Sequence, residues 1–198
     1  NTDFVEIGPP DARWPAAYAE EADAIRQALR AGAAALQFEH VGSTAVPGLA
    51  AKPVIDILLV PADGEWPHEA IRGALARLAY SFWASNPDPL HLFFVKGMPP
   101  FGERRTHHVH VRPRAQALPL LTFRDRLRAQ PELARSYEKL KLELAARFPL
   151  DREAYTRGKE EFVARAIESI DPRAPSCLRE SHDTPFLHAH GNLRRIPK

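Results

Sequence analysis

The sequence predicts an α+β fold, in which a mixed β-sheet is flanked by helices and followed by a C-terminal helical segment. Two observations lead to this prediction. Short runs rich in Val, Ile, Leu and Phe recur between residues 36 and 112, with one helical pattern among them. From about residue 118 to 170 the apolar residues instead recur at helical spacing. A sheet part (about 36–112) and a helical part (about 118–170) are therefore expected to form one domain over residues 1–170.

The composition favours a folded protein without a strong charge field. The chain has 198 residues, 44% of them hydrophobic, which is enough to bury a core. Its 27 basic and 25 acidic residues leave a formal net charge of +2, which disfavours nucleic acid as a partner. The single cysteine, Cys177, rules out an internal disulfide framework, and no run approaches the roughly 18 apolar residues of a membrane span. Because no charged-then-apolar leader follows Asn1, a cytoplasmic protein is expected; the composition does not indicate the oligomeric state.

The first elements follow from spacing and capping residues. Apolar side chains from Trp14 to Leu29 recur at helical spacing, with Asp11 as the expected N-cap and Gly32 near the C-terminal end. Leu36 to Val41 is the first expected core strand.

The later elements are bounded by Pro, Gly and Asn. Strands are expected at Val54–Val60, Tyr80–Ala84, Leu90–Val95 and Thr106–Val111. Helices are expected at His68–Leu78, from Leu118 onward with Pro131 resetting the pattern, at Glu132–Phe148 and at Arg152–Ile170. Residues 171–198 are rich in Pro, His, Arg and Ser and are expected to form a flexible or partner-dependent tail whose His and Cys177 match no zinc-site spacing.

One carboxylate interrupts the most apolar strand. Val54 to Val60 reads as a strand covered on both faces, yet it contains Asp56. An isolated buried charge costs several kcal/mol, so Asp56 must be paired, protonated or bound to a cation. Shortly before it, Gly42, Ser43 and Thr44 form a turn whose amides are suited to an anion such as phosphate. A phosphate-holding turn beside a metal-holding carboxylate is a layout for phosphoryl chemistry.

The segment EHVGSTAVPGLAAKPVIDI, from Glu39 to Ile57, resembles the hallmark segment of the GrpB-like family, whose fold is of the nucleotidyltransferase type. Further matching pieces are DARWP from Asp11, the histidine strand Thr106–Val111, FRDRLR from Phe123 and YEKLK from Tyr137, so that the resemblance covers about residues 3–170. Nucleotidyltransferases hold a triphosphate on the Gly-Ser turn and a divalent metal on strand carboxylates. The resemblance therefore implies a nucleoside triphosphate as substrate and Mg, Mn or Zn as cofactor.

One position departs from the nucleotidyltransferase pattern. A second acid usually follows two places after the first, but Leu58 stands there, which disfavours a two-metal site. Replacement ligands are expected from His108 and His110, which share a strand face while His107 points away. Imidazoles beside one carboxylate favour zinc, manganese or iron over magnesium. Surface or hydrogen-bonded core histidines remain the plainer interpretation, and Arg112 at the next position on that face argues against a histidine-triad hydrolase.

The predicted site combines these residues. Asp56 and Lys52 are the expected catalytic residues, and Asp56, His108 and His110 are the expected metal ligands. The expected phosphate- or nucleotide-binding residues are Gly42, Ser43, Thr44, Lys52 and Arg112. Glu39 or His40 is expected to face the pocket, and Arg124 is a candidate for reaching a substrate across the cleft. The plainer interpretation of that helix is an Asp125–Arg128 pair on its solvated face.

Three functions are compatible with this site. The leading hypothesis is a metal-dependent enzyme that transfers a nucleotidyl group to a small molecule. Leu58 favours a second hypothesis, a catalytically inactive nucleotide- or anion-binding module of the same fold. The third is a metal-dependent hydrolase that uses the histidines and Asp56.

Overall fold

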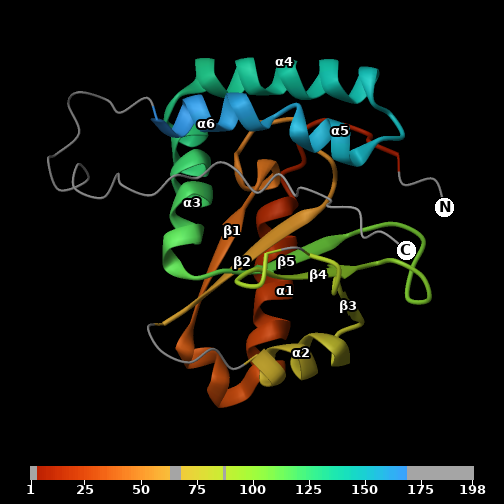
Figure 1. Cartoon of the computed structure of the whole chain (residues 1–198), viewed down its shortest axis with the longest axis vertical. Coiled ribbons are helices and arrows are strands. Elements are labelled where there is room, and N and C mark those ends of the chain that lie inside the picture. The colour runs from red at the N-terminus through yellow and green to blue at the C-terminus, as the bar shows by residue number, and fades with distance from the viewer. Residues whose placement is uncertain (1–3, 63–67, 87, 169–198) are drawn as a thin grey trace, which may run out of the picture. The chain divides into compact units, whose positions relative to one another are not determined.

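The computed structural model describes residues 4–62, 68–86 and 88–168, which belong to one compact unit. The chain up to Val111 supplies the sheet and the helices α1 and α2, and the part that follows supplies the helices α3 to α6 (Figure 1). The elements in chain order are α1 (Trp14–Leu29), the 3-10 helix η1 (Arg30–Ala35), β1 (Leu36–Val41), the 3-10 helix η2 (Ser43–Ala45), β2 (Ile55–Pro61), α2 (His68–Arg77), β3 (Tyr80–Phe82), β4 (Leu92–Lys96), β5 (His107–Val111), α3 (Arg114–Ala129), α4 (Pro131–Arg147), α5 (Arg152–Arg157) and α6 (Glu160–Glu168).

The sheet has five strands in the order β1-β2-β5-β4-β3. Only β2 and β5 run parallel to each other, and the other three pairings are antiparallel, so the sheet is mixed. The register places Asp56 of β2 between Val41 of β1 and His108 of β5. Phe93 of β4 lies opposite His110 of β5. The carboxylate and the histidine pair therefore sit on adjacent central strands.

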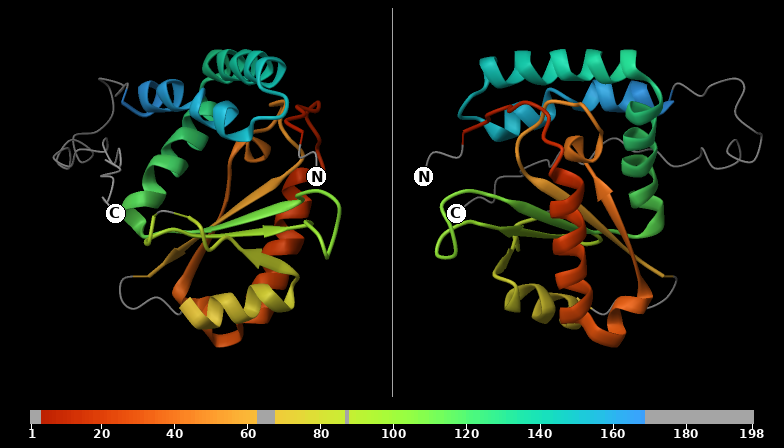
Figure 2. Two further views of the ribbon diagram at one scale, coloured as in Figure 1. Left: turned by 45° about the vertical axis from the view of Figure 1, so that its right-hand side comes forward. Right: turned by 180° about the vertical axis from the view of Figure 1, so that it is seen from behind.

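The two faces of the sheet are covered differently. On one face, α1 and α2 pack against the alternate residues of β2 and β5, including Ile57, Leu59 and Val109, which are fully buried. On the other face, Leu58 and Val60 pack against α3 (Figure 2). Since strand side chains alternate between faces, Asp56 belongs to the same face as Leu58. The candidate site therefore lies on the α3 side of the sheet.

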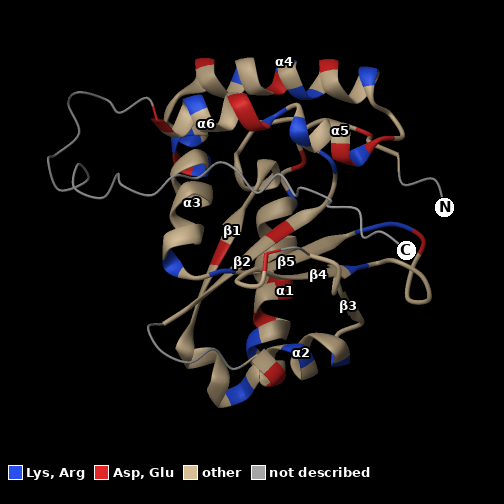
Figure 3. Ribbon diagram, viewed as in Figure 1, with Lys and Arg blue, Asp and Glu red and all other residues tan. Residues whose placement is uncertain are grey.

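The C-terminal helices pack on the loop between β1 and β2. Val46 and Leu49 of that loop join Leu127 of α3 and Tyr137 of α4 in one apolar cluster, and Tyr155 of α5 joins Val5 and Leu144 in a second. Acidic and basic side chains are interspersed along α4, α5 and α6 (Figure 3), with exposed i,i+4 pairs such as Arg165–Glu161. The helical segment is therefore anchored by apolar contacts directly over the turn that carries Ser43.

The expected fold class is confirmed: a mixed α+β sheet flanked by helices, with a C-terminal helical segment. α1 and β1 begin and end where the sequence predicts. Asp11 is not the N-cap; that residue is Arg13, whose backbone N–H donates to the Asp11 carboxylate over 2.8 Å. Gly32 does not end the helix either, because α1 stops at Leu29 and Gly32 lies within η1.

The last predicted helix is two helices. Residues expected to run continuously from Arg152 to Ile170 break between α5 and α6, at Gly158 and Lys159. Gly158 packs against Leu144 of α4 so closely that a side chain there would overlap it. Helical periodicity does not reveal such a break. Ile170 and the expected tail at 171–198, with Cys177, lie outside the described residues.

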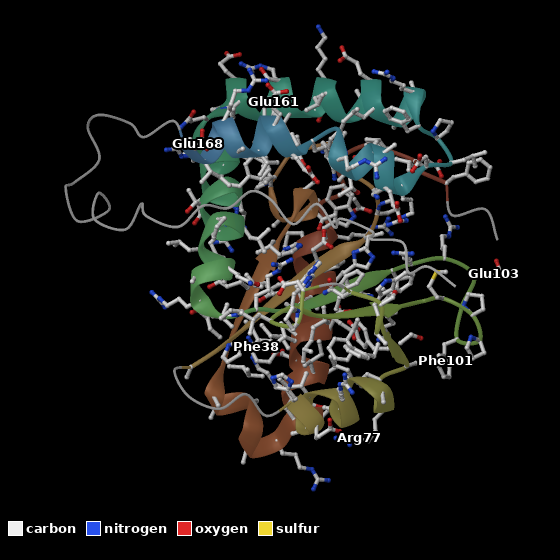
Figure 4. The ribbon with its side chains drawn as sticks, viewed as in Figure 1. Phe38, Arg77, Phe101, Glu103, Glu161 and Glu168 are labelled. Atoms are coloured by element: carbon white, nitrogen blue, oxygen red, sulfur yellow. The ribbon has the colours of Figure 1, made fainter. Side chains whose placement is uncertain are left out.

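Two further facts concern the surface. Among the helices that the structure describes, none combines the length and apolar character needed to cross a membrane. Phe101 and Glu103 lie on the loop between β4 and β5 and are exposed (Figure 4).

Candidate functional site

The turn after β1 has a backbone that only glycine adopts readily. Gly42 has φ of 72° and ψ of −172°, and it leads into η2, where Val46 N–H donates to the Ser43 carbonyl over 3.1 Å. A methyl group at Gly42 would overlap the Asp56 carboxylate. The turn and the carboxylate are therefore in direct contact. The Thr44 hydroxyl is turned inward, 3.1 Å from His40 Nε2 and 3.3 Å from the Val54 carbonyl oxygen.

Asp56 is paired with His108. His108 Nδ1 lies 2.9 Å from Asp56 Oδ1, and His110 Nε2 lies 3.6 Å from the same oxygen. Burial by itself would raise the pKa of Asp56, but the hydrogen bonding and proximity of His108 and His110 outweigh it and hold that pKa far below its ordinary value. Burial lowers the pKa of His108 despite the nearby carboxylate. An ionised Asp56 therefore accepts a hydrogen bond from Nδ1–H of a neutral His108.

The second ring nitrogen of His108 takes no part in this pairing. The His108 side chain is 11% exposed, and its buried Nε2 has no hydrogen-bond partner among the described residues. The ligand-capable atoms of Asp56, His108 and His110 all lie within 4.8 Å of one another. The three residues therefore form a compact group of one carboxylate and two imidazoles.

A third histidine extends the group. His91, just before β4, has its Nε2 3.0 Å from His110 Nδ1, and its own Nδ1 lies 2.9 Å from Arg112 Nη2. Burial, with help from His110 and Arg112, lowers the pKa of His91 to about 3. Phe93 stacks on the His110 ring with centroids 4.9 Å apart. The His91 and His110 rings are therefore held in place by protein groups on neighbouring strands.

Cationic and phenolic side chains from the helical segment approach the turn. Lys52 Nζ and Lys159 Nζ lie 4.8 and 4.5 Å from the centre of the Tyr155 ring. Burial lowers the pKa of Lys159, and the negative charge of Asp56 opposes that effect. Burial raises the pKa of Tyr137, against a hydrogen bond with Ser43. Lys159 therefore lies within electrostatic range of Asp56, and Tyr137 contacts Ser43.

The loop between β1 and β2 is clamped by α4. Ala50 N–H donates to the Glu138 carboxylate over 2.7 Å, and Lys141 Nζ donates to the Ala50 carbonyl oxygen. Lys141 is 1% exposed, and burial lowers its pKa to about 8. These two side chains fix the backbone just before Lys52.

The comparisons with known proteins give the chain its family. The model of the GrpB protein family matches residues 4–169. The chain belongs to the GrpB family. It is 56% identical over 165 residues to a UPF0157 protein of Pseudomonas aeruginosa, covering 83% of this chain and 67% of that relative. It is 34% identical over 169 residues to the UPF0157 protein YqkA of Bacillus subtilis, covering 83% of this chain and 47% of that relative.

A solved structure supports the same assignment. GrpB from Enterococcus faecalis has 30% sequence identity and a TM-score of 0.70, with 82% of this chain and 94% of that chain covered. The chain therefore shares the fold of that GrpB structure, and the nucleotidyltransferase type expected from Glu39–Ile57 stays a prediction. The chain spans only about half to two-thirds of the length of the two relatives above.

The GrpB-family structure brings together most of the residues singled out in the sequence. Gly42, Ser43, Asp56, His108 and His110 lie on one side of the sheet, and their roles stay predictions. Lys52 packs on the Tyr155 ring near them. The guanidinium of Arg112 is engaged with His91 and also donates to Gln116 over 3.1 Å, so a phosphate contact from it stays a prediction.

Arg124, Glu39 and His40 are engaged with neighbouring groups, so a contact of any of them with a substrate stays a prediction. Arg124 bonds Glu39 and Asp125, each at 2.7 Å, and donates to the His40 carbonyl oxygen over 2.9 Å. Asp125 also lies 3.5 Å from Arg128, as the plainer interpretation expects. His40 is buried and stacks on Tyr18 with centroids 4.6 Å apart. These residues tie α3 to the end of β1.

Sequence reasoning missed His91 and Lys159. His91 reaches the site because β4 pairs with β5, and the only signal for it was a histidine within the strand predicted at Leu90–Val95. Lys159 lies between α5 and α6, within electrostatic range of Asp56, and nothing in the local sequence indicates that the C-terminal helices bring it there. A hollow of about 480 Å³ between α1 and α2, lined by Arg30 and Glu69 among others, shares no residue with this site.

The buried His40 should make the protein acid-labile. Burial lowers the pKa of His40 to about 4, below the ordinary 6.5. Between these pH values the unfolded chain binds the extra proton and the folded chain does not, so stability is lost as the pH falls from 6.5 towards 4. We expect His40 to account for on the order of 3 kcal/mol of that loss. Urea unfolding of the wild type and His40→Gln at pH 7 and 4.5 measures it; equal acid losses in both proteins would refute the assignment.

Proposed function

We propose that this GrpB-family chain is a metal-dependent enzyme that transfers a nucleotidyl group to a small molecule. The observation that supports this most is the contact of Asp56 with both the Gly42–Ser43 turn and the imidazoles of His108 and His110. An anion-binding turn and a cation-binding group beside each other suit a substrate that carries both phosphate and metal.

The three side chains fit a divalent cation. Ligand atoms bound at about 2.0–2.1 Å in a tetrahedral site lie about 3.4 Å apart. The separations of 2.9 and 3.6 Å from Asp56 Oδ1 to the two imidazole nitrogens lie on either side of that value. One carboxylate and two imidazoles favour zinc or manganese over magnesium. A cation held there supplies charge stabilisation for the oxygens of a transferred phosphoryl group.

The chain's own residues divide the remaining tasks. The turn at Ser43 binds phosphate through its amides, and Lys52 and Lys159 balance the negative charge. His108 donates to Asp56 and thereby keeps the carboxylate ionised and oriented. α4 excludes water from one side by placing Tyr137 against the turn. The acceptor is a small molecule, since the net charge of +2 provides no field for nucleic acid.

Leu58 favours a second candidate, a nucleotide-binding module without catalysis. The position two residues after Asp56 is fully buried, packing with Val41, Val60 and Ala117. An apolar side chain therefore stands where many transferases have their second carboxylate. A site with one carboxylate can hold a nucleotide without the two-metal arrangement of those enzymes. The two imidazoles keep the hydrolase as a third candidate, because they suit zinc.

Thermal unfolding with nucleotides tests the proposal. Each nucleoside triphosphate is added with and without manganese, and a ligand that binds the folded state raises the melting temperature. We expect a rise of about 5 °C at saturation only when metal and nucleotide are both present. Pyrophosphate release with a panel of hydroxyl- and amine-bearing compounds then indicates nucleotidyl transfer. A temperature rise without turnover favours the binding module, phosphate release favours the hydrolase, and no rise with any combination contradicts all nucleotide functions.

Lys159 should contribute to phosphate binding. Its Nζ shares the Tyr155 ring with Lys52 and lies within electrostatic range of Asp56. We expect Lys159→Met to weaken nucleotide binding about tenfold, as expected for the loss of one charge-assisted hydrogen bond. Lys139→Met is the matched control, since Lys139 is exposed on α4 and lies 3.9 Å from Glu143. Equal affinities of the two variants, measured by calorimetry, would remove Lys159 from the site.

A further inference from the structure

A series of side-chain contacts connects the candidate metal site to Arg112. Arg112 Nη2 lies 2.9 Å from His91 Nδ1, and His91 Nε2 lies 3.0 Å from His110 Nδ1. His110 Nε2 lies 3.6 Å from Asp56 Oδ1. The rings of His91 and His110 are nearly parallel, with centroids 5.2 Å apart. His91 lies just before β4, His110 lies in β5 and Arg112 follows β5. The pairing of these two strands therefore fixes the order of the contacts.

The chemistry of arginine determines which group donates and which accepts in each of these hydrogen bonds. A guanidinium only donates hydrogen bonds, so His91 Nδ1 must accept and carries no proton. The proton of His91 is therefore on Nε2, from which it donates to His110 Nδ1. His110 Nδ1 in turn carries no proton, so the proton of a neutral His110 is on Nε2, the nitrogen that faces Asp56.

We propose that Arg112, acting through His91, is a positioning residue that holds the proton of His110 on Nε2 and so prevents His110 from binding a cation. An imidazole binds a metal only through an unprotonated nitrogen. His108 Nδ1 also carries a proton, so His108 binds a cation beside Asp56 once that proton has moved to its Nε2, which has no partner among the described residues. His110 joins them only when Arg112 no longer donates to His91. The metal part of this proposal rests on the proposed function, and the proton arrangement does not.

Arg112 has other acceptors that make its release feasible. Its Nη1 donates to Gln116 Oε1 over 3.1 Å and lies 3.7 Å from Asp88 Oδ2. When the bond to His91 is broken, His91 Nδ1 takes a proton from water, the proton on His91 Nε2 passes to His110 Nδ1, and His110 Nε2 releases its proton to water. His91 Nε2 then accepts from His110 Nδ1, and His110 Nε2 presents a lone pair. Each imidazole keeps one proton, so the change needs no net gain or loss.

Nitrogen NMR of the histidine rings tests the proton arrangement directly. The full chain is labelled with ¹⁵N-histidine and freed of metal with EDTA, and each ring is assigned by the signal lost in a single His→Gln variant. We expect His91 and His110 to carry their proton on Nε2 and His108 on Nδ1. A proton on Nδ1 of His110 in the wild type would overturn the proposal.

Zinc affinity tests the consequence. We expect Arg112→Met to bind zinc about tenfold more tightly than the wild type, whereas the loss of a supporting partner of a metal ligand usually weakens binding about 10- to 100-fold. Arg114→Met, two residues along on the exposed start of α3, is the control for lost charge. Titrations in 1 M salt, where the Debye length is about 3 Å, reduce the remaining effect of charge.

The outcomes are distinguishable. Unchanged or weaker zinc binding by Arg112→Met overturns the role of Arg112. If Arg112→Met does not fold, Arg112→Leu makes the same test, because an aliphatic side chain cannot donate to His91 Nδ1. If neither the wild type nor any Arg112 variant binds zinc, the metal site of the proposed function fails, while the NMR spectrum still decides where the proton of His110 lies.

Discussion

Replacement of Asp56 by asparagine should lower the affinity for zinc or manganese by about 100-fold or more. The carboxylate is the only anionic group among the three candidate ligands in the described structure, and an amide oxygen is a much weaker ligand for a divalent cation. Loss of a residue that only supports a metal ligand already weakens metal binding about 10- to 100-fold. Loss of a ligand itself should therefore lower the metal affinity by more. Calorimetric titration of both proteins measures the difference.

The fold should survive this change. Asparagine has the shape of aspartate, and its amide oxygen still accepts the hydrogen bond from His108 Nδ1. Asp23→Asn is the matched control, because Asp23 lies on the exposed side of α1, 2.7 Å from Arg26. Circular dichroism checks that both variants are folded. Metal binding by Asp56→Asn equal to that of Asp23→Asn would mean that the cation binds elsewhere.

Gly42→Ala should both destabilise the protein and damage the site. The backbone of Gly42, with φ of 72° and ψ of −172°, is one that L-residues rarely adopt, and the added methyl group would overlap Asp56. We expect a loss of about 3 kcal/mol or more in the free energy of unfolding, because the strained backbone alone costs about 1–3 kcal/mol. Urea unfolding measures the stability, and zinc titration measures the site.

Two other glycines separate the causes. Gly48 also has a positive φ, 75°, but a methyl group there would meet nothing within 4 Å. Gly48→Ala should therefore show the backbone cost without the loss of metal binding. Gly32 has neither feature, so Gly32→Ala should leave stability unchanged or slightly higher. If Gly42→Ala and Gly48→Ala behave alike in both measurements, Gly42 has no special contact with the site.

The strand face of Asp56 could be predicted because its signals are local. Alternation along a strand puts His108 and His110 on one side, and a carboxylate within an apolar run must have a partner. The same local logic predicted the limits of α1 and β1. What could not be predicted is that His108 itself is the partner of Asp56, since this depends on the parallel pairing of β2 with β5.

The missed residues depend on tertiary packing. His91 meets His110 only through the register of β4 against β5, which the alternation of either strand leaves open. Lys159 follows Tyr155 by four residues, a spacing that by itself brings two helical side chains together, but its nearness to Asp56 depends on how the C-terminal helices pack on the sheet part. The inward turn of the Thr44 hydroxyl is likewise set by His40 and Val54 rather than by its own neighbours in sequence.

Anomalous diffraction from crystals of the full chain soaked in zinc tests the central claim most directly. The account predicts one strong peak bonded to Asp56 Oδ1 and His108 Nδ1, with His110 Nε2 as the third protein ligand and Arg112 turned from His91 towards Gln116 or Asp88. It is contradicted by a map in which His108 still donates to Asp56 and every zinc peak lies away from these three side chains.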